Sequence, residues 1–191
     1  MFTAIKLKQV ITLRYHTFLD PTVRKVELCP YILKEYNNRW FLIAAACDTG
    51  KILTFPLDRI DNFNESYVQK FIPIPQDFDE HFEDIIGVTY NEDAPLEEII
   101  LWVSDKSKDY VLTKPIHGSQ ILIRGSQDAA LRAQYPKLIG GSYFKIKCKE
   151  NYELIRELIS FGAELVVIAP THIVAKLEDR LKSMLSNYSH I

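Results

Sequence analysis

A series of short strand-like segments joined by tight turns, within about the first sixty residues, constrains the fold most. Asn37-Asn38 favours a two-residue hairpin, because asparagine tolerates the positive φ that a primed turn demands. Asp48-Thr49-Gly50 supplies a second turn, and strand-like apolar patterns cover residues 10–16, 25–36, 39–47 and 51–57. Hairpin-connected strands must protect their edges, and closure into a small barrel does so. The first part of the chain is therefore predicted to be a small closed β-barrel.

The pattern of elements changes after residue 96. Strands are predicted over residues 98–103, 119–123, 143–149 and 164–169, with helices over 105–113, after Asn151, and after Pro170. Their order, βαββαβα, predicts a ferredoxin-like α+β unit with an extra terminal helix. In that last helix one face carries apolar residues at helical spacing, namely Ile173, Leu177, Leu181, Met184 and Tyr188. The loop over 125–141 is long enough to be functional, mobile or partly helical.

An acidic connector separates these two parts. Residues 1–59 hold nine basic and five acidic residues, residues 60–113 hold three and thirteen, and residues 114–191 hold eleven and seven. Within the connector, Phe78, Phe82 and Ile85 are spaced for one face of a short helix over 77–85. The expected division is a β-barrel domain at 1–63, a connector at 64–96 and a ferredoxin-like domain at 97–191.

Several classes of function are disfavoured by what the sequence contains. It has no apolar stretch of about eighteen residues and no secretory signal pattern at its start, so a cytoplasmic protein without a membrane partner is expected. Its three cysteines lie in apolar segments without metal-binding spacing, which predicts buried thiols and no disulfide. No phosphate-binding loop, dinucleotide fingerprint or hydrolase motif is present. We expect neither an enzyme nor a bound metal or cofactor.

Two motifs about sixty residues apart indicate a family. The first runs through Arg39-Trp40-Phe41-Leu42-Ile43 and ends at Leu57-Asp58-Arg59-Ile60; the second is Thr113-Lys114-Pro115-Ile116-His117-Gly118-Ser119-Gln120. Together they resemble the WYL family of bacterial ligand-sensing domains, followed by the C-terminal extension WCX. The resemblance implies an SH3-like or Sm-like barrel and the effector-binding, dimerising region of a transcriptional regulator. Most such proteins carry a winged helix ahead of this region, and none is expected here.

The resemblance and the chemistry of the side chains together suggest a binding site on the barrel. Arg59 follows a strand directly, and its planar guanidinium can donate two parallel hydrogen bonds to a phosphate. Tyr15 and Arg24 match an aromatic and a basic position of similar proteins, and Tyr15 could stack on a base. Further cations that could steer an anion are Arg14, Lys25, Arg39 and Lys51. The alternative is that Arg59 pairs with Asp58 and that the other cations are solvated.

One feature of the sequence reduces the expected affinity for a polyanion. Leu53 and Pro56 occupy positions that are basic in many similar proteins, which reduces the charge available to a polyanion.

His117 and Gln120, in the second motif, are candidates for a contact with a ligand or between modules. The alternative for both is architectural: they would satisfy backbone groups between a helix and a strand. Trp40 and Phe41 are expected to support the site from the core.

The predicted function is the effector-binding and dimerising region of a WYL-type transcriptional regulator that senses a single nucleic-acid strand or a nucleotide. The alternative is a protein-interaction adaptor without a nucleic-acid ligand. A nucleic-acid site predicts that Arg14, Arg24, Lys25, Lys51 and Arg59 converge beside an exposed aromatic residue. An adaptor predicts scattered charge and an exposed apolar patch.

Overall fold

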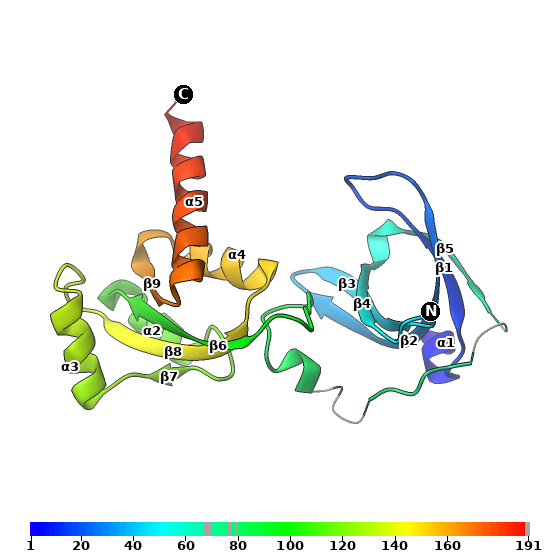
Figure 1. Cartoon of the computed structure of the whole chain (residues 1–191), viewed down its shortest axis with the longest axis horizontal. Helices are drawn as coiled ribbons and strands as arrows, with labels where there is room; N and C mark the ends of the chain where they lie inside the picture. The colour runs from blue at the N-terminus through cyan, green and yellow to red at the C-terminus, as the bar shows by residue number, and fades with distance from the viewer. Residues whose placement is uncertain (67–69, 76–77, 79, 190–191) are drawn as a thin grey trace. The chain divides into compact units, whose positions relative to one another are not determined.

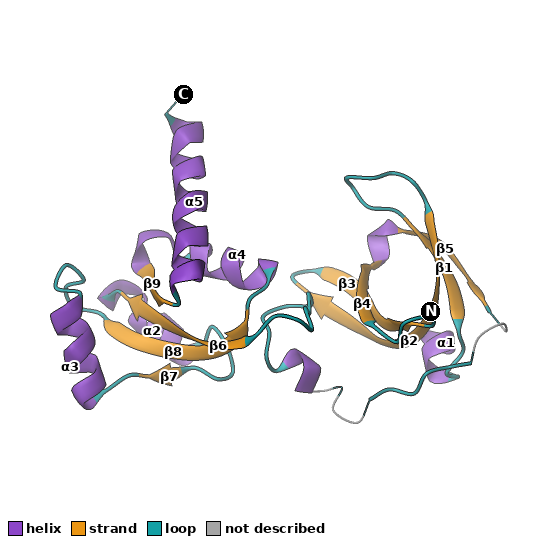
Figure 2. Ribbon diagram, viewed as in Figure 1, coloured by secondary structure: helices purple, strands orange, loops and turns teal. Residues whose placement is uncertain are grey.

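The computed structural model describes residues 1–66, 70–75, 78 and 80–189 (Figures 1 and 2). The chain forms two compact units, Met1–His81 and Phe82–Ile191. Each unit has a sheet and a hydrophobic core of its own, so each is described by itself. No helix in the described ranges is long and apolar enough to cross a membrane.

The first unit is a five-stranded antiparallel sheet with the strand order β4-β3-β2-β1-β5. Its elements are α1 (Phe2–Lys6), β1 (Ile11–Tyr15), β2 (Arg24–Tyr36), β3 (Arg39–Ala46), β4 (Ile52–Pro56), the 3-10 turn η1 (Leu57–Arg59) and β5 (Ile60–Glu65). The sheet curls around a core that includes Ile11, Leu13, Leu28 and Leu42, each fully buried (Figure 2). The predicted hairpin at Asn37-Asn38 is confirmed, with φ of 53° and 61°.

The predicted closure of this barrel is where the structure differs from expectation. Strands β4 and β5 lie at the two ends of the strand order, and no ladder joins them in the described part of the chain. The chain crosses from one to the other through the three residues of η1. In the described part of the chain the unit is therefore a curled open sheet.

The connector differs from its predicted structure as well. Among the described residues, only the short 3-10 turn η2 (Glu80–Phe82) is found where a helix over 77–85 was expected, and Asp77 and Asp79 lie outside the described residues. Phe78 and Ile85 are nevertheless buried. The apolar spacing therefore identified buried positions without identifying the backbone conformation.

The second unit confirms the α+β class. Its strands are β6 (Leu96–Val103), β7 (Ile121–Leu122), β8 (Ser142–Lys149) and β9 (Leu165–Ala169), and its helices are α2 (Asp105–Thr113), α3 (Gly125–Gln134), α4 (Tyr152–Ser160) and α5 (Thr171–Tyr188), with a 3-10 turn η3 (Gly162–Glu164). The antiparallel strand order β7-β8-β6-β9 is that of a ferredoxin-like sheet. The predicted strand over 119–123 shortens to two residues, and the loop over 125–141 contains α3.

Asn151 shows how the sequence positions α4. Its side-chain Oδ1 accepts a hydrogen bond from Leu154 N at 2.8 Å, which caps the helix as predicted. Its Nδ2 donates to the carbonyl oxygens of Ile86 at 2.8 Å and Thr89 at 2.9 Å. One buried amide thus fixes both the start of α4 and the segment that precedes β6. The helix then packs Leu154 and Leu158 into the core of the second unit.

Candidate ligand-binding rim

The end of β1 brings an aromatic and a basic side chain together on the inner face of the first sheet. Tyr15 lies directly opposite Arg24 in the antiparallel ladder, so both side chains project from the same face. Tyr15 is half-buried and packs edge-on against Phe55, with ring centroids 5.0 Å apart. The register of the ladder thus places these two candidate site residues side by side.

The 3-10 turn η1 places Arg59 beside this pair. The backbone carbonyl of Arg59 accepts a hydrogen bond from His16 N at 3.2 Å, which fixes the turn against the end of β1. The Arg59 guanidinium lies 4.2 Å from the centroid of the Phe18 ring, in a cation–π contact. Phe18 is itself 67% exposed, so its other face is available to solvent.

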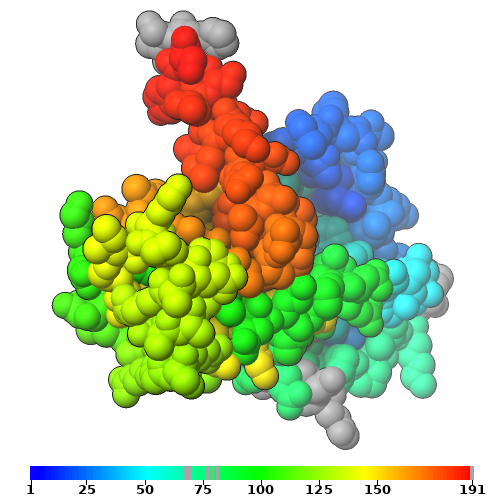
Figure 3. All heavy atoms as spheres, turned by 60° about the vertical axis from the view of Figure 1, so that its left-hand side comes forward, coloured from blue at the N-terminus to red at the C-terminus, as the bar shows by residue number. Residues whose placement is uncertain are grey.

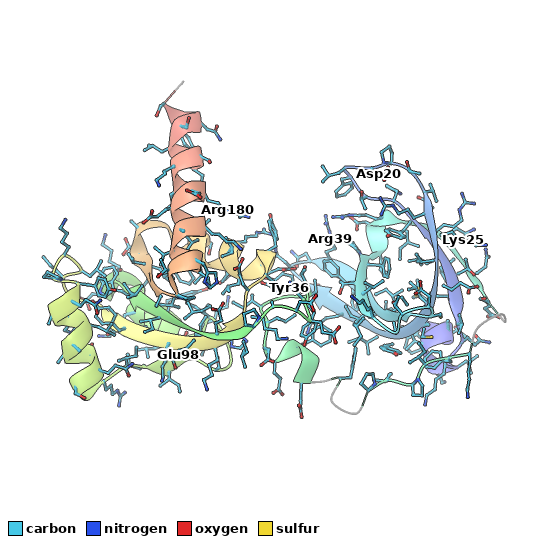
Figure 4. All side chains as sticks on the ribbon, in the orientation of Figure 1. Asp20, Lys25, Tyr36, Arg39, Glu98 and Arg180 are labelled. Carbon is cyan, nitrogen blue, oxygen red and sulfur yellow. The ribbon has the colours of Figure 1, made fainter. Side chains whose placement is uncertain are left out.

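Arg39 lies on the other side of the same turn. It begins β3, and its guanidinium is 3.5 Å from the carboxylate of Asp58, the residue before Arg59. Figure 4 shows Arg39 and Asp20 at this end of the unit, near η1. We define the arginine rim as the five residues that surround η1 and the loop between β1 and β2: Tyr15, Phe18, Arg24, Arg39 and Arg59.

Carboxylates neutralise part of the rim. Arg24 donates to Asp20 at 2.8 Å, and this hydrogen bond is the main reason why the pKa of Asp20 falls to about 2. The same contact raises the pKa of Arg24. Asp61 lies 3.0 Å from the ring of His16, on the edge of the rim. Two of the three rim arginines therefore already have an acidic partner.

Arg59 is the exception. No carboxylate of the described residues lies within ion-pair distance of its guanidinium. Its Nε is buried and has no hydrogen-bond partner within the described ranges, while the side chain as a whole stays partly exposed. The alternative for Arg59, a pair with Asp58, is not found among the described ion pairs, and Asp58 pairs with Arg39. A guanidinium without an acidic partner, carried by a fixed turn, is the feature of the rim best suited to an anionic ligand.

The remaining predicted cations lie elsewhere, so the expected convergence of five basic residues is wrong. Arg14 is opposite Lys25 in the ladder, and because neighbouring residues alternate, this pair projects from the face opposite to Tyr15 and Arg24. Lys51 precedes β4, whereas η1 follows it, so Lys51 and Arg59 lie at opposite ends of that strand. The site is thus smaller and less basic than the sequence suggested.

His117 and Gln120 have internal partners in the second unit. The buried His117 ring pairs through Nδ1 with Ser119 Oγ at 2.7 Å, and Ser119 N donates to the same ring nitrogen at 3.2 Å. Burial lowers the pKa of His117. Gln120 accepts from Ile116 N at 3.0 Å and donates to Val111 O at 2.9 Å. These contacts correspond to the architectural alternative, and neither residue is part of the arginine rim as defined.

Phe18, which belongs to the rim, and Asp20, which pairs with the rim residue Arg24, were not identified from the sequence as part of the site. Both lie in the loop between β1 and β2. The available signal was an apolar pair, Phe18-Leu19, in a loop where polar residues are usual. Trp40, expected in the core, is 49% exposed, whereas Leu42 of the same motif is fully buried. No cluster of three metal-ligating side chains occurs among the residues described.

Fold and rim together define a class: a curled β-domain with an aromatic and arginine-lined edge, followed by a ferredoxin-like domain. Family models identify it more closely. The model of the WYL domain matches residues 1–64, and that of the WCX domain matches residues 95–185. The chain belongs to the WYL family and carries the WCX domain as its extension, as its motifs indicated.

Solved structures resemble the chain at low identity. One is the crystal structure of a CRISPR Cas-related protein, with a TM-score of 0.52 and 10% identity over 99% of this chain and 50% of that one. Another is proteasome accessory factor B/C (PafBC) of Arthrobacter aurescens, with a TM-score of 0.37 and 18% identity over 94% of this chain and 25% of that one. The chain thus spans half of the first protein and a quarter of the second. No curated protein matches it significantly.

Proposed function

We propose that this chain is the effector-binding and dimerising region of a cytoplasmic WYL-type transcriptional regulator, without catalytic activity, and that its effector is a single nucleic-acid strand or a nucleotide held at the arginine rim. The observation that carries the proposal is Arg59, whose guanidinium stacks on the exposed Phe18 ring and has no acidic partner among the described residues. Such a group can donate a bidentate pair of hydrogen bonds to a phosphate. A base could then stack on the open face of Phe18.

The charge of the rim limits the size of the effector. Arg24 and Arg39 are already paired with Asp20 and Asp58, so one phosphate is bound by Arg59 and further ones require these pairs to open. For single strands the affinity changes with the salt concentration to a power of about 0.7 per phosphate. Raising the salt four-fold should therefore weaken binding by about 2.6-fold for one phosphate and about 18-fold for three. A nucleotide or a short strand fits this rim better than a long polyanion.

The test is fluorescence anisotropy with labelled single-stranded DNA and RNA at about 50 and about 200 mM salt. Arg59→Ala should weaken binding at least ten-fold, whereas Arg14→Ala, which removes an exposed arginine from the opposite face of the same sheet, should leave it within about two-fold. Arg59→Lys keeps the charge but loses the planar fork and should fall between the two. Equal losses in the Ala variants would place the ligand elsewhere.

A protein-interaction adaptor is the second candidate, and two observations favour it. The first is that Arg14, Lys25 and Lys51 lie away from Arg59, which is the scattered charge that an adaptor predicts. The second is that Leu19 is 98% exposed and Val23 is 42% exposed in the loop that also carries Phe18, so the rim presents apolar as well as cationic surface. An adaptor predicts no binding of either nucleic acid at low salt. That result, with the fold intact by circular dichroism, would favour a protein ligand at the same loop.

A further inference from the structure

We propose that Cys29 and Cys47 form an oxidisable dithiol site, in which a small-molecule disulfide such as oxidised glutathione links the two sulfurs and releases residues 70–75 from the sheet of the first unit. The third free cysteine, Cys148, lies in the core of the second unit. The inference is separate from the proposed effector site, because Cys29 projects from the face of the sheet opposite to Arg24.

The register of β2 with β3 brings the two thiols together. Cys29 is opposite Ala45, and Cys47 N donates to Glu27 O at 3.0 Å, so the two cysteines are diagonal neighbours on one face. Their Sγ atoms are 3.4 Å apart. A disulfide bond requires the sulfurs to approach by roughly 1.4 Å. Side-chain rotation can provide this shift, because Cys47 lies one residue beyond the end of β3.

The Cys29 thiol also holds a segment that crosses the outside of the sheet. We call residues 70–75 the outer segment. Ile72 N donates a hydrogen bond to Cys29 Sγ at 3.2 Å, and Tyr31 Oη donates to Pro73 O at 3.3 Å. The Tyr31 ring packs edge-on against Phe71, with ring centroids 6.1 Å apart. Figure 3 shows the outer segment at the surface of its unit, in blue-green at the lower right.

Oxidation removes one of these attachments. When Cys29 Sγ turns toward Cys47, it moves away from Ile72 N, and the hydrogen bond between them is lost. The outer segment then depends on its contacts with Tyr31. Along the chain this segment leads to the second unit, which begins at Phe82. Its release therefore lengthens the free part of the chain between the two units.

The more accessible thiol starts the exchange. Cys47 is half-buried and Cys29 is fully buried, so the reagent meets Cys47 first. The Cys47 thiolate bonds to one sulfur of the reagent and displaces the other as a thiolate. Cys29 then attacks Cys47 Sγ and displaces the second half of the reagent. The two protein thiols lose two electrons and two protons, and the reagent gains them to give two small thiols.

The surroundings of Cys47 make this oxidation slow at neutral pH. Burial, the contact with Cys29 and nearby carboxylates raise the pKa of Cys47 to about 12. Because the thiolate is the nucleophile, the rate should increase about ten-fold for each unit of pH below that value. Once Cys47 has reacted, the fold already holds Cys29 Sγ beside it, which favours closure of the disulfide. The pair therefore responds to prolonged oxidation.

The site is tested by incubating the full chain with oxidised glutathione at about pH 8 and about pH 9, followed by an acid quench. The wild-type protein should lose two thiols, about ten-fold faster at the higher pH, and peptide mass mapping should find Cys29 linked to Cys47. Cys148 should stay reduced and serves as an internal control. Cys47→Ala keeps the Cys29 acceptor for Ile72 N but removes its partner, so it should form no internal disulfide.

Hydrogen exchange tests the release of the outer segment. In the oxidised wild type, peptides covering residues 70–75 should exchange about five-fold faster, the factor that corresponds to one lost hydrogen bond of about 1 kcal/mol. The same peptides in treated Cys47→Ala, and peptides from α4, should not change. A native protein that keeps both thiols reduced, while the same reagent oxidises the urea-unfolded chain, would overturn the site. A disulfide between Cys29 and Cys47 with unchanged exchange over 70–75 would overturn the release.

Discussion

Replacement of Asn151 by alanine is expected to destabilise the second unit by about 3 kcal/mol. The substitution removes the helix cap to Leu154 N, which contributes about 1 kcal/mol. It also leaves the carbonyl oxygens of Ile86 and Thr89 without the donor that now lies 2.8 and 2.9 Å away, at about 1 kcal/mol each. The residue is 8% exposed, so water replaces these bonds poorly.

The two-unit chain requires a probe that reports on this unit alone. The protein has two tryptophans, Trp40 in the first unit and the buried Trp102 in the second. In a Trp40→Phe background, tryptophan fluorescence during urea unfolding therefore follows the second unit. With a denaturant dependence of about 1.5 kcal/mol per molar urea, a loss of about 3 kcal/mol lowers the midpoint by about 2 M.

A second substitution separates the cap from the two donor bonds. Asn151→Asp keeps an acceptor for Leu154 N but replaces the donor with a second oxygen facing the carbonyls of Ile86 and Thr89. It should be at least as destabilising as alanine at neutral pH, because a buried carboxylate then faces two acceptors. A midpoint for Asn151→Asp close to that of the wild type would refute this reasoning, since the donor bonds would then contribute nothing.

Two further predictions concern charge. Asp20→Asn retains an acceptor for the backbone N–H of Thr22 but releases Arg24. Binding of a labelled single strand at low salt should therefore strengthen by about two- to three-fold, and its salt dependence should steepen by about one phosphate. Unchanged anisotropy titrations would show that Arg24 does not contact the ligand. Burial lowers the pKa of His117, so the unfolded chain binds this proton more readily than the folded one. The contribution of His117 to the free energy of unfolding has its full value above the ordinary histidine pKa of about 6.5, and it decreases as the pH falls below that value. Urea midpoints measured between pH 7 and pH 5 should therefore fall, and less steeply in His117→Gln.

Local signals in the sequence predicted much of the fold. Asn37 and Asn38 adopt the positive φ that their hairpin requires, and Asn151 caps α4. The hairpin turn and the helix cap both depend on interactions between residues that are close together in the sequence, so they can be predicted from it. The strand order of the second unit followed from the alternation of strands and helices along the chain.

The differences arose where distant segments decide the outcome. The position of α3 was not evident, because only Leu131 of its ten residues is buried and no apolar period marks it. The membership of the arginine rim depended on the register of β1 with β2, which pairs Tyr15 with Arg24 across an eight-residue loop. A shift of one residue would have exchanged Arg24 for Lys25 on the inner face, and the alternation of Val26 and Leu28 with Glu27 disfavours that register.

The turn η1 has a mechanical consequence for the first unit. It is the covalent link between β4 and β5, the two strands at the ends of the strand order. The turn bridges the two edge strands of the sheet, and Arg59 is its last residue. A molecule that engages Arg59 therefore restrains both edges at once. Amide hydrogens along β4 and β5, several residues from the contact, should exchange more slowly with solvent when a ligand is bound at Arg59.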